Sequence, residues 1–103
     1  MYFQGPSSVL SFMDFLFRKY EYIQTKRTYY WLEYVKTRTD KRQIFIAVRC
    51  EGGLIFIGFP ERATLVIEVA PFKIYHPQFK IGDKCVWLPI FLDTIRECFE
   101  DLN

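Results

Sequence analysis

Residues 89–102 constrain the fold strongly, because apolar side chains recur there at the spacing of one helix face. Pro89 suits the first turn of such a helix, where its missing N–H costs nothing. The stripe is formed by Phe91, Leu92, Ile95, Cys98, Phe99 and Leu102. The opposite face carries Asp93, Arg96, Glu97, Glu100 and Asp101. We therefore expect a C-terminal helix that packs on a sheet and turns its acidic side away from it.

The rest of the chain favours one short helix and several strands. A serine N-cap at Ser7 or Ser8 predicts a helix that ends near Lys19. Residues 22–37 are rich in Tyr, Trp, Thr and Val and contain no Gly or Pro, which predicts a long first strand. Further strands are expected at 43–50, 54–59 and 64–69, with a tight turn at Gly52 and Gly53, an extended piece at 72–75, and a hairpin around 81–84 that leads into 85–88.

These elements predict an α+β fold, in which an antiparallel sheet of four to six strands is followed by the amphipathic helix on one face, with a short N-terminal helix. A pleckstrin-homology-like barrel capped by the last helix also fits the length. Such a barrel needs about seven strands, however, and the sequence indicates five or six.

The length of 103 residues is that of one domain. Residues 1–6 include Tyr2-Phe3-Gln4-Gly5, which resembles the tail of an engineered protease-cleavage site, so residues 7–103 are taken as the domain. No apolar run reaches the roughly 18 residues of a membrane helix. Three cysteines without a Cys-x-x-Cys pair indicate reduced, buried thiols and an intracellular protein, nuclear or cytoplasmic.

Residues with catalytic potential are sparse. The only histidine, His76, lies between Tyr75 and Pro77 in an expected loop. Zinc-type ligand spacing and a glycine-rich phosphate loop are both absent from the sequence. We predict a protein that is not an enzyme and has no cofactor, no metal and no small-molecule substrate.

Charge is distributed unevenly along the chain. Residues 18–49 carry nine Lys or Arg against three acidic residues, whereas the remainder carries five against nine. The same segment contains seven rings: Tyr20, Tyr22, Tyr29, Tyr30, Trp31, Tyr34 and Phe45. Cations interleaved with aromatics are typical of surfaces that hold single-stranded nucleic acid.

Strand alternation divides this segment into two faces. It predicts a binding face with Lys26, Tyr30, Tyr34 and Lys36, and a core face with Ile23, Trp31 and Val35. Phe45 and Arg49 share a face of the next strand and extend the binding face, and Arg38, Lys41 and Arg42 belong to the connecting turn. Two alternatives stay open: the rings cover the sheet or form a dimer contact, and the turn is a solvated hairpin tip.

The order of these elements and the run Lys26-Arg27-Thr28-Tyr29-Tyr30 resemble the PUR repeat of Pur-alpha-like proteins, over about residues 22–102. The chain is also similar to the Whirly and transcriptional positive-cofactor folds. It departs from a plain repeat in its long segment at 71–84, its extra N-terminal helix and the absence of a second repeat.

The resemblance implies binding of single-stranded DNA or RNA on a curved sheet. It implies contacts from Lys26, Arg27, Tyr30, Tyr34, Lys36, Phe45 and Arg49. Because two halves pair in that group, it also implies a homodimer. The competing hypothesis is a protein-interaction or oligomerisation domain, since interfaces are enriched in the same aromatic residues and arginine.

Overall fold

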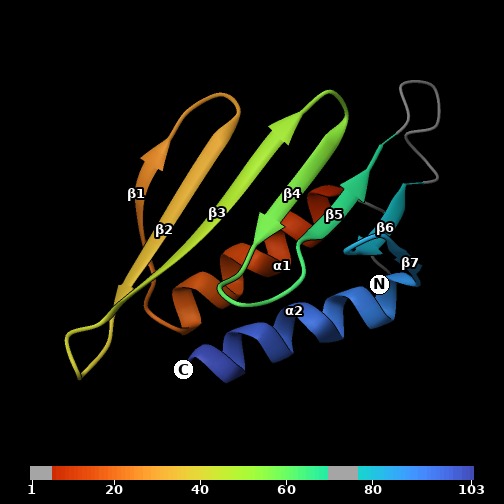
Figure 1. The fold of residues 1–103 in the computed structure, drawn as a ribbon. Helices are drawn as coiled ribbons and strands as arrows, with labels where there is room; N and C mark the ends of the chain where they lie inside the picture. The colour runs from red at the N-terminus through yellow and green to blue at the C-terminus, as the bar shows by residue number, and fades with distance from the viewer. Residues whose placement is uncertain (1–5, 70–76) are drawn as a thin grey trace.

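The computed structural model describes residues 6–69 and 77–103. It contains two helices and seven strands (Figure 1). In chain order these are α1 (Pro6–Lys19), β1 (Ile23–Arg27), β2 (Trp31–Thr37), β3 (Gln43–Glu51), β4 (Leu54–Gly58), β5 (Leu65–Glu68), β6 (Gln78–Ile81), β7 (Lys84–Val86) and α2 (Leu88–Leu102). The predicted extended piece at 72–75 and the loop position of His76 lie outside the described residues.

The seven strands form one antiparallel sheet in which each strand pairs with its neighbours in the chain, in the order β1 to β7. This confirms the α+β class, while the predicted count of four to six strands is too low. The end strands β1 and β7 are not paired with each other, so the described strands make an open sheet and not a closed barrel.

The strand predicted over 22–37 is in fact a hairpin. It is broken at residues 28–30, where the backbone N–H of Thr28 donates to the carbonyl of Trp31 at 2.8 Å. The side-chain hydroxyl of Thr28 donates to the same oxygen at 3.3 Å. A threonine that bonds the local backbone supplies the turn without Gly or Pro, and this signal is weak in a sequence.

Both helices pack on the same face of the sheet, below it in Figure 1. The fully buried side chains come from both layers: Val9 and Met13 of α1, Phe91, Ile95 and Phe99 of α2, and Ile46, Val48, Ile57 and Ile67 of the strands. The predicted stripe of α2 is therefore confirmed as the core side of that helix. The other face of the sheet carries neither of the two described helices, and we call it the helix-free face.

The β3–β4 connection depends on two glycines with positive φ, at +56° for Gly52 and +79° for Gly53. Such values in a two-residue loop produce the turn that matches the twist of antiparallel strands. The carbonyl of Gly53 also accepts a hydrogen bond from the N–H of Val69 at 2.8 Å. A Cβ on Gly53 would lie 2.7 Å from the Val69 carbonyl oxygen, whereas one on Gly52 would meet nothing within 4 Å.

We expect Gly53→Ala to lower the free energy of unfolding by about 1–3 kcal/mol, because it adds a backbone clash to a strained φ. The matched variant Gly52→Asn should cost less than about 1 kcal/mol, since asparagine tolerates positive φ. Urea unfolding followed by circular dichroism measures both. Equal losses in the two variants would contradict the role of the Val69 contact.

Tyr22 is a buried tyrosine whose hydroxyl has no hydrogen-bond partner among the described residues. Its ring packs edge-on against Phe17 and Phe99, with centroids 5.6 and 5.7 Å away. Burial raises the pKa of Tyr22 from 10.0 to about 12, and the charge of Arg38 opposes this rise. The neutral phenol is thus favoured in the fold, although its hydroxyl makes no compensating bond.

Replacing this hydroxyl should not destabilise the protein. We expect Tyr22→Phe to leave the free energy of unfolding unchanged or to raise it by about 1 kcal/mol. Above pH 10 the unfolded phenol ionises before the folded one, so the wild type loses stability between pH 10 and about 12, and the variant should lose less. Denaturant titrations at neutral and alkaline pH test this, and a clear loss at neutral pH would indicate an unseen partner for the hydroxyl.

Candidate functional site

The two faces of β2 are the reverse of those predicted. Tyr34 is only 8% exposed and lies on the helix side, with its ring stacked on Phe17 at a centroid distance of 3.7 Å. Its hydroxyl accepts a hydrogen bond from the side-chain amide of Gln24 at 3.0 Å. Lys36 also points to the helix side and donates to the side-chain oxygen of Asn103 at 2.8 Å. The sequence-based assignment of Tyr34 and Lys36 to an open binding face is therefore wrong.

The register explains the reversal. Tyr34 pairs with Ile46 and Leu32 with Val48, and both β3 partners are buried under the helices. Since neighbouring strands share their faces, Trp31 and Val35 must then project from the helix-free face. Tyrosine can occupy a core position when its hydroxyl is hydrogen-bonded, and Tyr34 meets that condition.

A bulge in β1 changes the face of another predicted residue. The register shifts between Gln24 and Lys26, so Lys26 lies opposite Glu33 on the helix-free face. Ile23, predicted in the core, is 70% exposed on that same face opposite Val35. Lys26 thus reaches the open side of the sheet, but with different neighbours from those expected.

The remaining predicted residues fall into three places. Phe45 and Arg49 lie on the helix-free face, as alternation along β3 predicts. Arg27 and Tyr30 lie at the end of the β1–β2 hairpin, beside the fully exposed Tyr29. Arg38, Lys41 and Arg42 form the exposed β2–β3 turn, where the backbone N–H of Arg42 donates to Asp40 at 3.0 Å.

A row of bulky side chains crosses the helix-free face. Trp31 pairs with Arg49, and Arg49 pairs with Phe56 on β4. The guanidinium of Arg49 lies over the Phe56 ring, 4.5 Å from its centroid. The indole N–H of Trp31 donates to a Glu33 carboxylate oxygen at 3.2 Å, which fixes the ring at the β2 end of the row.

Beside this row runs a line of small side chains. Ala47 pairs with Gly58, and the carbonyl of Thr64 accepts a hydrogen bond from the N–H of Gly82 at 2.8 Å. The result is a groove of about 590 Å³, which we call the trough, lined among others by Trp31, Ala47, Arg49, Phe56, Gly58 and Thr64. Gly58 is paired regularly, without a bulge, and its missing side chain leaves the trough floor low at this point.

The sequence reasoning missed the trough, although two signals pointed to it. β4 is apolar on both faces, which is unusual for a strand that covers only one core. Gly58 interrupts that strand where a larger residue would favour strand structure. Neither signal says which face is uncovered, so Phe56 and Trp31 could not be selected as site residues.

The cationic residues of β1 and the β2–β3 turn have few ion-pair partners. Of these cations, Lys26 lies on the helix-free face, whereas Arg27 is paired with Leu32 on the helix side. Lys26, Arg27, Arg38 and Lys41 form no ion pair with any residue in 6–69 or 77–103. On the helix side, by contrast, Arg62 holds Asp101 at 2.9 Å and Glu97 at 3.4 Å. The acidic side of α2 thus lies on the opposite layer from the helix-free face.

The cysteines differ in burial, and this corrects the prediction of uniformly buried thiols. All three are free, but only Cys98 is buried, while Cys50 is half-buried and Cys85 is exposed. Burial raises the pKa of Cys98, and the neighbouring Arg62, whose guanidinium donates to Sγ at 2.9 Å, opposes the rise. A thiol whose pKa is raised is mostly protonated and a weak nucleophile.

No protein-family model, no curated protein and no solved structure matches this chain. Within the described part of the chain, no group of three or more His, Cys, Asp or Glu side chains could hold a metal ion. Neither of the two described helices is long and apolar enough to span a membrane. The helix-free face is therefore the feature of the molecule from which a function can be inferred.

Proposed function

We propose that the protein binds single-stranded DNA or RNA on the helix-free face. The observation that carries this proposal is the row formed by Trp31, Arg49 and Phe56, in which rings and a guanidinium lie side by side on a sheet face without a helix. Rings of this kind offer stacking surfaces to unpaired bases, and arginine adds contacts to bases or phosphates.

The surrounding charges support a polyanionic ligand. Lys26 lies on the same face, and Arg38 and Lys41 extend from the β2–β3 turn without ion-pair partners among the described residues. The glutamates of the face have partners of their own: Glu68 pairs with Lys80 at 2.8 Å, Glu51 lies 3.7 Å from Arg49, and Glu33 accepts a hydrogen bond from Trp31. Phosphate contacts of this kind act by releasing counterions.

The proposed function is the one that the PUR-like resemblance implies, but the residues that contact the nucleic acid differ from those that the resemblance implies. Tyr34 and Lys36 are removed from the contact set because they face the helices. Trp31 and Phe56 take their place beside Arg49, and Lys26 and Phe45 remain. Arg27, Tyr30, Arg38, Lys41 and Arg42 are retained as contacts at the strand ends.

The two tryptophans provide an internal control for this face. Trp31 lines the trough, whereas Trp87 lies at the start of α2, beyond the far edge strand β7. In a Trp87→Phe variant, a single-stranded oligonucleotide of about 15 nucleotides should quench the fluorescence of Trp31. In a Trp31→Ala variant, the same oligonucleotide should leave the fluorescence of Trp87 unchanged and bind about 5- to 100-fold more weakly, because one stack is lost.

Affinity measured by fluorescence anisotropy should also fall steeply as salt is raised, because each phosphate contact displaces counterions. Absence of binding at low salt would refute the proposal. Binding with quenching of Trp87 alone would place the nucleic acid on another surface.

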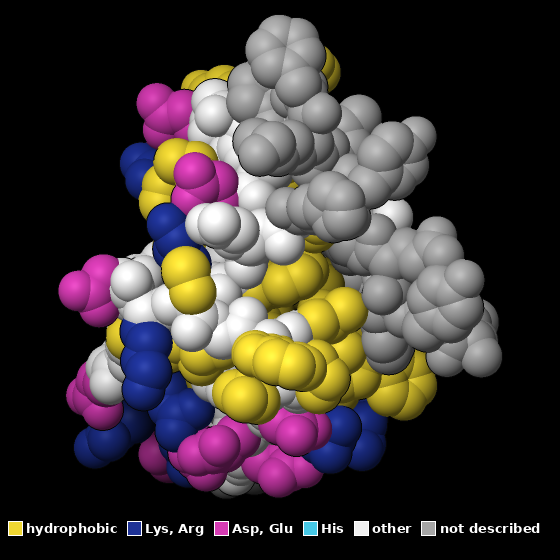
Figure 2. Space-filling model, turned by 90° about the vertical axis from the view of Figure 1, so that its right-hand side faces the viewer, with side chains coloured by type: hydrophobic (Ala, Val, Ile, Leu, Met, Phe, Trp, Pro, Cys, Tyr) yellow, Lys and Arg dark blue, Asp and Glu magenta, His cyan; other side chains and the backbone are white. Residues whose placement is uncertain are grey.

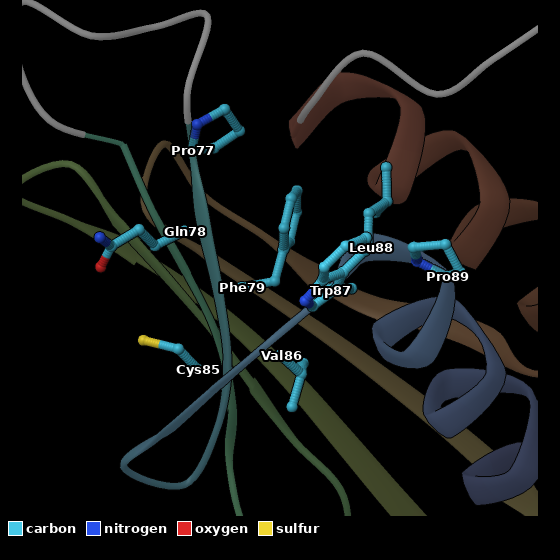
Figure 3. Close-up of a pocket in the computed structure, with 8 residues that line it drawn as sticks. All are labelled: Pro77, Gln78, Phe79, Cys85, Val86, Trp87, Leu88 and Pro89. Carbon is cyan, nitrogen blue, oxygen red and sulfur yellow. The ribbon is translucent and has the colours of Figure 1, made fainter.

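A second observation favours a protein contact elsewhere. At the start of α2, Trp87 is 79% and Ile90 is 52% exposed, and Figure 2 shows hydrophobic side chains gathered on this side of the molecule. An apolar cavity of about 470 Å³ adjoins them, lined by Phe79, Val86 and Leu88 among others (Figure 3). We propose that a second copy of the chain covers this surface, since one edge of β7 also has no partner strand among residues 6–69 and 77–103.

Light scattering over a range of concentrations tests this second proposal. We expect a dimer for the wild type and a monomer for Trp87→Ser, because the variant removes the most exposed apolar ring of the patch. Phe45→Ser is the matched control, since Phe45 is 53% exposed on the helix-free face and should not affect assembly. A wild type that remains monomeric at every concentration would refute the dimer.

A further inference from the structure

We infer that the trough seats one unstacked base of the bound strand, with the guanidinium of Arg49 contacting that base or its phosphate. This inference rests on the proposed function and adds to it a defined subsite. It predicts that the protein distinguishes a base-bearing strand from a bare sugar-phosphate chain. Binding through phosphates alone would not do so.

The floor of the trough has the shape for a flat group. Ala47 lies opposite Gly58, and Thr64 comes directly before Leu65, the partner of Ile57. Small side chains therefore follow one another across three neighbouring strands. With strands about 4.8 Å apart, this low floor extends for about 10 Å across the sheet.

The wall of the trough supplies planar partners. Trp31 stands at one end, held by its hydrogen bond to Glu33. Arg49 follows, with its guanidinium carbon over the ring of Phe56, 4.5 Å from the centroid. Guanidinium planes and aromatic rings are the groups on which unpaired bases stack in protein complexes.

The hydrogen-bond donors of Arg49 favour a base over an apolar side chain as the ligand of the trough. Its nearest carboxylate oxygen, on Glu51, is 3.7 Å away, which is too long for a hydrogen bond. Its guanidinium makes no hydrogen bond to any side chain or backbone atom in 6–69 and 77–103. An apolar peptide side chain in the trough would offer these donors no acceptor, whereas a base or its phosphate would accept from them.

A variant whose new side chain fills the trough tests the inference directly. A Cβ on Gly58 would lie 3.8 Å from the Ala47 carbonyl oxygen, an ordinary contact, and this glycine does not have a positive φ. Gly58→Val should therefore fold normally, with a melting temperature no lower than that of the wild type, while its side chain fills the floor. Gln43→Val is the matched control. It places a valine on the same face of the sheet, but on β3 and outside the trough.

Two probes are compared by competition anisotropy: an oligothymidylate and an abasic chain of the same length. The wild type and Gln43→Val should prefer the oligothymidylate by about 10-fold, within the range expected for one stacked base. Gly58→Val should lose most of this preference, since only rings outside the trough remain to stack on bases, and it should keep the salt dependence of the wild type because its cations are unchanged.

The outcomes separate this inference from the proposed function. If the wild type binds the two probes equally, or if Gly58→Val keeps the preference, bases do not occupy the trough and the inference is wrong, while nucleic-acid binding stands. If the wild type binds neither probe at low salt, the proposed function fails and the inference fails with it.

Discussion

The stack between Phe17 of α1 and Tyr34 of β2 determines the orientation of the sheet. The two rings are almost parallel, 8° apart, with centroids 3.7 Å from each other. Phe17 also meets Phe99 of α2 edge-on at 5.0 Å, so the same ring joins both helices to the strand. Because side chains in a strand alternate, fixing Tyr34 on the inside fixes Trp31 and Val35 on the outside. The candidate site thus depends on a contact in the core.

Placing both helices on one face leaves the other face with side chains that would suit a core. Phe45 is 53% exposed there, and Phe56 and Val66 are half-buried. Larger residues at Ala47 and Gly58 would close this surface into a continuous apolar patch. The small residues open a trough instead, and Arg49 introduces hydrogen-bond donors beside it. A surface with rings, donors and a low floor suits a flat polar guest better than a second apolar sheet.

The sequence predicts the elements of this fold well where one local signal dominates. The stripe from Phe91 to Leu102 determines α2, and Gly52 with Gly53 determines the β3–β4 turn. The division of residues 22–37 into β1 and β2 rests on the hydrogen bonds of Thr28, which composition does not reveal. The choice of inner face depends on Phe17, which lies far from Tyr34 in the sequence. Alternation separates two sets of residues but does not say which set meets the helices.

Only the folded structure shows on which side of the sheet each group of charged residues lies. Along the sequence, the cations of 18–49 and the acids of 89–102 are simply two segments of opposite sign. In the fold, α2 covers the face of the sheet that holds Tyr34, so its carboxylates lie on the helix layer. Arg62 and Arg96 pair with several of them, which weakens their attraction for the unpaired cations of β1 and the β2–β3 turn. A polyanion that approaches α2 meets these carboxylates, whereas on the helix-free face the cations Lys26, Arg49 and Lys80 lie among Glu33, Glu51 and Glu68. Stacking on the exposed rings, more than long-range attraction, therefore favours binding on the helix-free face.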